Sequence, residues 1–483
     1  MHKKTFILMM LVFVALTARA IDEYQFRSGT AVLKGRILNK PADEWNIISV
    51  NAYDLFTGEE LVYTIPVAAD GTFEGSIHLP HSQSVLAEDV SDIFIAVGDT
   101  VEVTKDAAQD AYKGVTIGGH GTSADINRLW PQVKQHYFGD KQLFINGLAR
   151  ENIPKWKRKM VKLIDTVIAD IEADRLPLPA GSSAYVKEVM SASLLGELLM
   201  AFMENYRYNI TGNNYANIKV SEYGEYYDFL AGRERWLLDN PAMLLVMDSP
   251  DHLFSYTGVY IMIDIAFMPH EEGESQAEYY RKASSAITSR YGLKNIGFMQ
   301  QMVLCRNALR EDRLSPESDP DNTAEYVAGI IPLITHPVIA CHALDRYRQY
   351  VKERELKVVE QQPVTKGDSI FQRIIEPYKG NALFVDFWGM SCGPCRAGML
   401  EEREKVERLK DQPVRFLYIC DEKDGPREHA EKWMMENNIR GEHIFVTHEE
   451  WQLLSAKFQF NAIPFKIGVD KDGNIVAYDA VSK

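Results

Sequence analysis

Two cysteines near the C-terminus constrain this chain more than any other feature. Cys392 and Cys395 are separated by Gly-Pro and follow a strand-like apolar run, Phe384-Val-Asp-Phe-Trp388. A helix that begins at Cys392 would point its unpaired backbone N–H groups and the positive end of its dipole at that sulfur, which favours the reactive thiolate. Cys395 lies about one turn further on, near enough to close a short disulfide loop. The pattern therefore predicts thiol–disulfide exchange chemistry.

Length and composition limit the class of protein. The chain has 483 residues, which is too long for one hydrophobic core and predicts about three domains. Its hydrophobic share of 46% and charged share of 25% are ordinary for a soluble globular protein. The formal net charge of -15 argues against nucleic acid or an anionic membrane surface as a partner, because neither attracts a polyanion.

The N-terminus has the pattern of a secretory signal peptide. Two lysines precede an apolar run from Phe6 to Leu16, and small residues occupy Ala18 and Ala20. The alternative, a transmembrane anchor, is weaker because the run is about ten residues long and about twenty are needed. No cysteine follows the cleavage point, which excludes a lipid anchor there. We expect residues 1–20 to be removed after Ala20, and the mature protein to be periplasmic without membrane insertion.

The remaining cysteines are isolated. Cys305, Cys341 and Cys420 each lie among apolar neighbours. Such cysteines are usually small buried hydrophobic residues. A Cys305–Cys341 bridge is the alternative that the sequence leaves open. In either case, the chain has few cysteines for structural disulfides, and we expect the close pair at 392 and 395 to be reactive.

The pattern of apolar residues divides the chain into three parts. Residues 21–118 contain short strand-like runs separated by turn formers, which predicts a small antiparallel β-sandwich without an evident site. Residues 121–360 have a helical period and predict an all-α domain. The predicted helices are one starting near 124 and capped by Thr122-Ser123, and others over 160–171, 184–206, 223–239, 277–291, 296–310 and 323–355.

The helical part is rich in tyrosine. Examples are Tyr206, Tyr208, Tyr223, Tyr226, Tyr227, Tyr256, Tyr260, Tyr279 and Tyr280. A tyrosine-rich helical face could bind an extended partner, because tyrosine combines apolar area with a polar tip. More often such residues fill gaps between helices, and we favour that interpretation.

After a linker over 361–367 the pattern alternates between strands and helices. Strands are predicted at 383–387, 414–420, 443–446, 465–469 and 475–478, and helices at 392–410, 427–437 and 451–458. Alternation of this kind predicts a central sheet with helices on both faces. The fold class is therefore multidomain, with an N-terminal β-sandwich, a central all-α domain and a C-terminal α/β domain at 367–483.

The C-terminal part resembles the thioredoxin superfamily. More narrowly, it is similar to the exported thioredoxin-like proteins related to the cytochrome-maturation thiol reductases of Gram-negative bacteria. Three elements carry the resemblance: Val385-Asp-Phe-Trp388, Cys392-Gly-Pro-Cys395, and Ala462-Ile-Pro464 ahead of a strand–turn–strand. A lone Cys-x-x-Cys also occurs in zinc sites, but tetrahedral zinc needs two further ligands and no second pair is present in the sequence.

The resemblance implies a redox-active disulfide with no metal and no other cofactor. Cys392 would be the exposed attacking thiol and Cys395 the buried resolving thiol, with Gly393 and Pro394 forming the active-site loop. A protein disulfide would be the substrate, and an upstream thiol donor would return the pair to the dithiol. The Gly-Pro pair between the cysteines resembles that of the reducing members of the family, whose redox potentials are about -270 mV.

Four further residues acquire roles through the same resemblance. Pro464 would be the cis-proline that faces the disulfide, and Ile463 would offer its backbone to an extended substrate segment. Asp386 would be the buried carboxylate that takes up and returns the proton of the resolving thiol, because burial raises a carboxyl pKa. A solvated residue at a strand end is the alternative for Asp386. Trp388 would pack against the active-site helix near the substrate.

The chain also departs from the family. Ser391 stands where the family usually has tryptophan, and Gly389-Met390 is atypical. Peroxiredoxins need a threonine at the position of Gly389, so peroxide chemistry is disfavoured. The sequence stops at Lys483, where the family continues into a helix, and we expect a truncated end.

The order of β, helical and thioredoxin-like parts resembles exported proteins common in Bacteroidetes. The leading hypothesis is an exported thiol–disulfide oxidoreductase that reduces protein disulfides. The alternative is a partner-binding or redox-sensing protein, in which the β and helical domains bind a protein or peptide and the dithiol is secondary.

Overall fold

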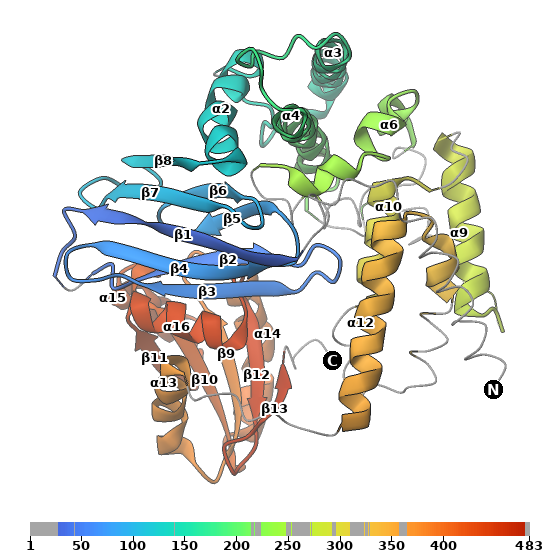
Figure 1. The fold of residues 1–483 in the computed structure, drawn as a ribbon. Helices are drawn as coiled ribbons and strands as arrows, with labels where there is room; N and C mark the ends of the chain where they lie inside the picture. Colours follow the sequence, from blue (N-terminus) through green and yellow to red (C-terminus); the bar gives the residue numbers. More distant parts are fainter. Residues whose placement is uncertain are drawn as a thin grey trace. The chain divides into compact units, whose positions relative to one another are not determined.

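A computed structural model describes most of the chain after the predicted signal peptide (Figure 1). The described residues are 28–42, 44–139, 141–213, 217, 224–247, 253, 271, 273–291, 296–309, 323, 327, 329–356 and 365–478. The segment 1–20, predicted to be a signal peptide, lies outside them, as do Tyr223, Tyr256 and Tyr260. The chain forms two compact units: unit 1 comprises Met1–Asn39, Ala52–Glu59 and Glu74–Val359, and unit 2 comprises Lys40–Asn51, Glu60–Phe73 and Glu360–Lys483.

Two four-stranded sheets form from the N-terminal strands, in the orders β4-β1-β7-β8 and β3-β2-β5-β6. The strands are β1 (Gly29–Leu38), β2 (Ile47–Tyr53), β3 (Glu60–Pro66), β4 (Thr72–Leu79), β5 (Gln83–Ala87), β6 (Ser91–Ile95), β7 (Thr100–Asp106) and β8 (Val115–His120). The prediction of a purely antiparallel sandwich is wrong, because β1 pairs with β7 in parallel. Five strands intervene between them, so no hairpin forces opposite directions.

Strand β5 was not predicted, because its sequence begins with polar residues. Gln83 is nevertheless fully buried. Its side-chain amide donates to the Tyr53 carbonyl and accepts from the Tyr53 N–H, both at 2.9 Å. Both the donor and the acceptor of this amide pair with backbone groups. These bonds replace those to water, so the polar side chain can be buried.

Helices make up the rest of unit 1, and α4 lies at the centre of its core. Buried residues surround α4, including Leu194, Leu195, Leu198 and Leu199 at 0% exposure, as expected for a helix without a solvent face. The α-helices described in this unit are α2 (Thr122–Tyr137), α3 (Ile153–Glu172), α4 (Ala184–Asn205), α6 (Glu234–Leu237), α9 (Gln276–Tyr291), α10 (Phe298–Leu309) and α12 (Pro337–Leu356).

Two predicted helices are wrong as continuous elements. In the segment predicted at 223–239, a 3₁₀ turn and the one-turn helix α6 are separated by Gly232, whose φ of 81° no right-handed helix accepts. In the segment predicted at 323–355, α12 begins only at Pro337. Proline suits a first helical position because it has no N–H to donate.

The predicted cap of α2 is also wrong. The helix starts at Thr122 itself, and Gly121 is its cap residue without a side-chain hydrogen bond. The Ser123 hydroxyl instead donates to Asp99 at 2.7 Å and accepts from the Ala96 N–H at 2.8 Å. Ser123 therefore ties the helix to a neighbouring turn of the β part.

Most of the tyrosines that the structure describes in the helical part are buried between helices, and Tyr208 is exposed. Tyr206, Tyr226 and Tyr227 are at most 6% exposed, and the Tyr206 and Tyr226 ring centroids are 5.0 Å apart. The Tyr226 hydroxyl donates to the Phe202 carbonyl at 2.9 Å, so its polar tip is satisfied inside. Tyr208 is exposed, at 37%. The interior-packing interpretation therefore holds for the buried members of the set.

The C-terminal part of unit 2 is built on a five-stranded sheet, in the order β11-β10-β9-β12-β13 (orange to red in Figure 1). Strands β9, β10 and β11 are parallel, β12 runs antiparallel to β9, and β13 runs antiparallel to β12. The bounds are β9 (Ala382–Trp388), β10 (Val414–Asp421), β11 (Glu442–Val446), β12 (Phe465–Val469) and β13 (Ile475–Tyr478). All five strands predicted for this part are confirmed within one or two residues.

Helices cover both faces of this sheet, as the alternation predicted. On one face Leu383, Val385 and Phe387 pack with α13 (Lys366–Ile375) and α16 (His448–Phe458). On the other face Trp388, Tyr418 and Cys420 pack with α14 (Gly393–Leu409) and α15 (Arg427–Glu436). Successive residues of β9 point to opposite faces, so Asp386 shares the α14 face with Trp388.

The linker predicted over 361–367 extends too far, because helix α13 begins within it. It begins at Lys366 and is preceded by Thr365, whose hydroxyl accepts from the Asp368 N–H at 3.1 Å. The Asp368 carboxylate accepts from the Thr365 N–H at 2.7 Å, which completes a capping box. Residues 365–367 therefore belong to a helix start and not to a linker.

Within unit 2, one side chain satisfies the edge of strand β3. The Val62 N–H donates to Gln459 Oε1 at 2.9 Å, and Gln459 Nε2 donates to the Val62 carbonyl at 3.1 Å. An edge strand otherwise presents unpaired N–H and C=O groups. Next to this pair, the Glu60 carboxylate accepts from the Asn461 N–H at 2.6 Å.

None of the helices described here is long and apolar enough to cross a bilayer. Cys305, Cys341 and Cys420 carry free thiols, so the alternative Cys305–Cys341 bridge is absent. Cys305 and Cys420 are buried, as expected, and Cys341 is partly exposed.

Candidate active site

The dithiol lies where strand β9 gives way to helix α14. Cys392 is the cap residue of α14, and its Sγ accepts from the Cys395 N–H at 3.1 Å. Pro394 lies in the first turn, where its missing N–H leaves no bond unmade. Cys392 and Cys395 form a disulfide with Cα atoms 5.3 Å apart. The helix therefore begins at the first sulfur and directs backbone N–H groups toward it.

The two sulfurs differ in exposure. Cys392 is partly exposed, whereas Cys395 is 1% exposed and belongs to the core beneath α14. Gly393 and Pro394 are exposed between them. An incoming group can therefore reach Cys392, while Cys395 is shielded.

The predicted proline loop lies beside the dithiol. The Ile463–Pro464 peptide bond is cis. The Ile463 carbonyl oxygen is 3.6 Å from Cys392 Sγ. Strand β12 follows this loop and pairs with β9, with Phe465 opposite Phe387, which brings residues 463–464 to the edge where β9 ends. Pro464 is exposed. The structure thus brings together Ile463, Pro464 and the cysteines predicted to act with them.

Asp386 is buried on the α14 face of β9, at 5% exposure. Burial raises the pKa of its carboxyl to about 7, and the Glu402 charge adds to the rise while Lys466 opposes it. Lys466 Nζ is 3.5 Å from Asp386 Oδ2 and 2.9 Å from Glu402 Oε1. A carboxyl with a pKa near neutrality, under the helix that carries both sulfurs, can bind or release a proton.

Lys466 and Glu402 were not predicted as site residues. Lys466 faces Asp386 across the β12–β9 ladder, and Glu402 reaches it from α14. The charges of both acids raise the lysine pKa, although burial lowers it. The signal in the sequence was a charged residue inside an apolar strand, Phe465-Lys-Ile467. A buried cation in such a strand needs an acidic partner.

Trp388 is buried at 1% exposure, in the same cluster as Cys395 and Met399. Its ring centroid is 6.0 Å from that of Trp433 on α15. The structure therefore places Trp388 beneath the active-site helix. Contact between Trp388 and a substrate remains a prediction.

The loop before Cys392 is held by an acidic residue that sequence analysis missed. The Ser391 N–H donates to Asp424 Oδ2 at 3.0 Å, and the Ser391 hydroxyl donates to Asp424 Oδ1. The Cys392 N–H donates to the Gly389 carbonyl at 3.1 Å. Nothing in the sequence links position 424 to position 391, because the pairing of β9 with β10 creates the contact.

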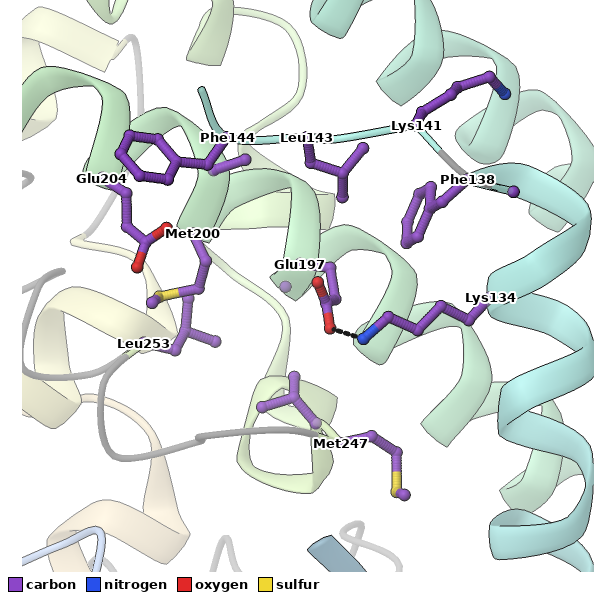
Figure 2. Close-up of a pocket in the computed structure, with 14 residues that line it drawn as sticks. Lys134, Phe138, Lys141, Leu143, Phe144, Glu197, Met200, Glu204, Met247 and Leu253 are labelled. Carbon is purple, nitrogen blue, oxygen red and sulfur yellow. Dashed lines mark hydrogen bonds and ion pairs between the residues drawn. The ribbon is translucent and has the colours of Figure 1, made fainter. Parts of the chain in front are cut away.

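A separate cavity of about 370 Å³ lies in unit 1 (Figure 2). Its lining combines apolar side chains, among them Met200, Met247 and Leu253, with charged ones, and Glu197 pairs there with Lys134 at 2.6 Å. The figure shows Glu204 and Met200 projecting from the same helix toward the space. No residue predicted for the site lines this cavity.

Among the residues that the structure describes, no group of three or more His, Cys, Asp or Glu side chains is placed to hold a metal ion. The groups that the structure brings together at the site are two sulfurs, one carboxyl group with a raised pKa, and backbone groups.

Comparisons with known proteins give partial likenesses. No protein-family model and no curated protein matches the chain. Among solved structures, one neighbour is the thioredoxin domain of a thiol-disulfide oxidoreductase from Bacteroides vulgatus, 22% identical with a TM-score of 0.20. The alignment covers 22% of this chain and 73% of that one. A thiol:disulfide interchange protein from Chlorobium tepidum is 19% identical with a TM-score of 0.20, covering 22% of this chain and 72% of that one.

Proposed function

We propose that this chain is an exported thiol–disulfide oxidoreductase that reduces protein disulfides through Cys392 and Cys395. The observation that carries the proposal is the asymmetry of the sulfur pair. Cys392 is partly exposed at the start of α14, and Cys395 is buried one turn away. A structural disulfide has no need for one open sulfur, whereas an exchanging pair requires it.

In the first step the Cys392 thiolate attacks one sulfur of a substrate disulfide. A bond forms between Cys392 Sγ and that sulfur, the substrate S–S bond breaks, and one substrate thiolate leaves. The α14 N-terminus stabilises the attacking thiolate. An extended substrate segment would lie along the exposed 463–464 loop, where the Ile463 carbonyl already faces Cys392.

In the second step Cys395 resolves the mixed disulfide. Its thiol gives its proton to Asp386, the sulfur attacks Cys392 Sγ, and the second substrate thiolate leaves. Two electrons have then passed from the dithiol to the substrate, and Cys392 and Cys395 are joined as in this structure. A pKa of about 7 suits Asp386 to accept this proton near neutral pH.

The electron source and the compartment belong to the same proposal. An upstream thiol protein would reduce the Cys392–Cys395 disulfide, and a periplasmic location would follow from removal of residues 1–20. The absence of a membrane-spanning helix among the described residues neither supports nor opposes export. The proposed partners are protein disulfides and a thiol donor, and no nucleic acid.

The test is to trap the mixed disulfide. Cys395→Ser keeps the attacking thiol and cannot resolve, so it should accumulate covalent adducts with disulfide-bonded proteins. Cys392→Ser should trap little, because the buried thiol cannot reach a substrate. Cys341→Ser, which removes the one partly exposed free thiol that the structure describes, is the matched control and should behave as wild type.

Wild-type protein should also reduce insulin disulfides with turnover when dithiothreitol is supplied. An intact dithiol that gives no turnover and no trapped adduct would contradict the proposal. Such a result would favour the alternative of a binding or sensing protein, for which the cavity in unit 1 would be the first place to examine.

A further inference from the structure

Two atypical residues of the active-site loop meet the same carboxylate. Ser391 donates both its N–H and its hydroxyl to Asp424. A Cβ atom on Gly389 would collide with Asp424 Oδ2, so no larger residue fits while the carboxylate stays in place. The glycine and the serine are therefore explained together, as the two residues that let Asp424 reach the loop before Cys392.

Asp424 is itself firmly placed. It ends a 3₁₀ turn, Glu422–Asp424, directly after β10, and β10 pairs with β9 so that Cys420 lies opposite Trp388. Asp421 caps this turn by accepting from the Lys423 N–H at 2.9 Å. The other Asp421 oxygen is 2.7 Å from His448 Nδ1. The start of the turn is thus held through both oxygens of Asp421, and its position follows from strand register.

The carboxylate binds the residue that directly precedes the attacking sulfur. Ser391 and Cys392 are consecutive, so their Cα atoms are about 3.8 Å apart, and charges interact over a Debye length of about 8 Å at physiological salt. The Asp424 charge also affects the thiol of Cys420. Burial raises the pKa of the Cys420 thiol to about 12, and Asp424 and Asp421 contribute to this rise.

We propose that Asp424 is a positioning residue that sets the reducing strength of the dithiol. Its carboxylate holds the loop leading into Cys392 and keeps a negative charge beside that sulfur. This inference rests on the proposed function and concerns the regulation of the same site.

The direction of the effect follows from charge. The disulfide form of the pair is uncharged, so Asp424 destabilises only the reduced form that carries the Cys392 thiolate. The helix N-terminus stabilises that thiolate, and Asp424 opposes it. By destabilising the Cys392 thiolate, the Asp424 charge favours the disulfide form. The dithiol is therefore a stronger reductant.

Three full-length variants separate charge from loop structure. Asp424→Asn keeps an acceptor for Ser391 and removes the charge. Ser391→Ala keeps the charge and removes the hydroxyl bond. Asp411→Asn removes an exposed carboxylate at the opposite end of β10 and is the charge control. Other charged groups near the dithiol stay unchanged in every variant, namely Arg396, Asp421, Lys423, Asp386, Lys466 and Glu402.

The measurements are the pKa of Cys392 by alkylation rate and the equilibrium of the pair with glutathione. We expect Asp424→Asn to lower the Cys392 pKa by about half a unit and to weaken disulfide formation about threefold, which is about 14 mV less negative at 29.6 mV per tenfold. Ser391→Ala and Asp411→Asn should keep the wild-type pKa. An unchanged pKa in Asp424→Asn, or an equal fall in Ser391→Ala, would overturn the inference.

A measurement on wild type covers the case in which Asp424→Asn does not fold. Raising salt from about 0.1 M to about 1 M shortens the Debye length from about 10 Å to about 3 Å, which should screen the carboxylate and lower the Cys392 pKa. A pKa that rises or stays constant would contradict the inference. Insulin turnover by wild type is measured in parallel, so failure of the proposed function is recognised separately.

Discussion

The Asp386 carboxyl is buried, and burying an ionisable group destabilises the folded state when that group is charged. Its carboxyl pKa is raised to about 7, mainly by burial, against about 3.9 in an unfolded chain. Below about pH 4 both states hold the proton, and no difference arises. Between about pH 4 and pH 7 the unfolded state loses the proton first, so the folded state binds more protons and stability falls as pH rises.

The first prediction concerns this pH dependence. Replacing Asp386→Asn removes the titrating group, so the loss of stability between about pH 5 and pH 8 should shrink by about 2–4 kcal/mol. Lys466 keeps Glu402 as its partner at 2.9 Å in the variant. Urea unfolding followed by circular dichroism at both pH values measures the difference. An identical pH dependence in wild type and variant would contradict the raised pKa.

The second prediction concerns the resolving step. If Asp386 accepts the Cys395 proton, Asp386→Asn should slow release of the mixed disulfide by about 10²-fold near neutral pH, since general bases contribute that much or more. The rate should recover at higher pH, where the Cys395 thiol ionises unaided. Stopped-flow measurement of the mixed-disulfide lifetime tests this, with Glu402→Gln as a control that keeps the Asp386 carboxyl. Equal lifetimes at neutral pH would exclude the role.

Site residues that lie close together in the sequence could be predicted. Their partners from distant parts of the chain could not. The spacing of Cys392 and Cys395 is short, so sequence alone brought them together. Lys466 lies eighty residues from Asp386, and Asp424 lies thirty-three from Ser391. These pairs depend on strand register, which a single sequence encodes only through the whole fold.

At the scale of elements, helices α13 and α16 of unit 2 begin at local capping boxes. Thr447 and Glu450 form a capping box at α16, with the Thr447 hydroxyl accepting from the Glu450 N–H at 3.3 Å. The Glu450 carboxylate accepts from the Thr447 N–H at the same distance. Such a box satisfies two N–H groups that no helical carbonyl can reach.

The third prediction follows from this box. Thr447→Ala should destabilise α16 by about 1 kcal/mol, which corresponds to about fivefold faster hydrogen exchange of its amides. The matched control is Ser455→Ala inside the same helix, which removes a hydroxyl that donates to the Gln452 carbonyl at 3.0 Å. Its exchange should stay near the wild-type value. Equal effects in the two variants would show that the cap does not hold the helix start.

Errors at the element scale have two physical causes. The parallel pairing of β1 with β7 could not be predicted, because hairpin turn signals describe neighbouring strands only. The helix predicted over 223–239 is broken at Gly232, whose φ is 81°, because a helical period does not show which glycine adopts a positive φ. The helix predicted over 184–206 matches α4 to one residue, whereas the one predicted over 160–171 misses the first seven residues of α3.

At the scale of the whole molecule, the dithiol and the large helical core belong to different units. Every residue of the proposed redox site lies in Glu360–Lys483 of unit 2. Destabilising the core of unit 1 should therefore leave the redox chemistry unchanged as long as unit 2 stays folded.

The fourth prediction tests this separation. Leu198→Ala removes a side chain at 0% exposure from the centre of α4 and should cost about 2–5 kcal/mol. Thermal unfolding followed by circular dichroism should show an earlier transition. Below that transition the glutathione equilibrium of the dithiol should match wild type. A shifted equilibrium in a folded variant would show that the helical part tunes the site.

The pairing of Gln459 with Val62 bears on how this protein can be divided for experiment. A recombinant fragment that starts at residue 365 would keep both cysteines, and it would lack the strand whose backbone this glutamine satisfies. Gln459 and the Asn461 N–H, two residues ahead of Ile463, would then face water in place of Val62 and Glu60. Activity measured on such a fragment would come from a 463–464 loop that has lost one of its supports.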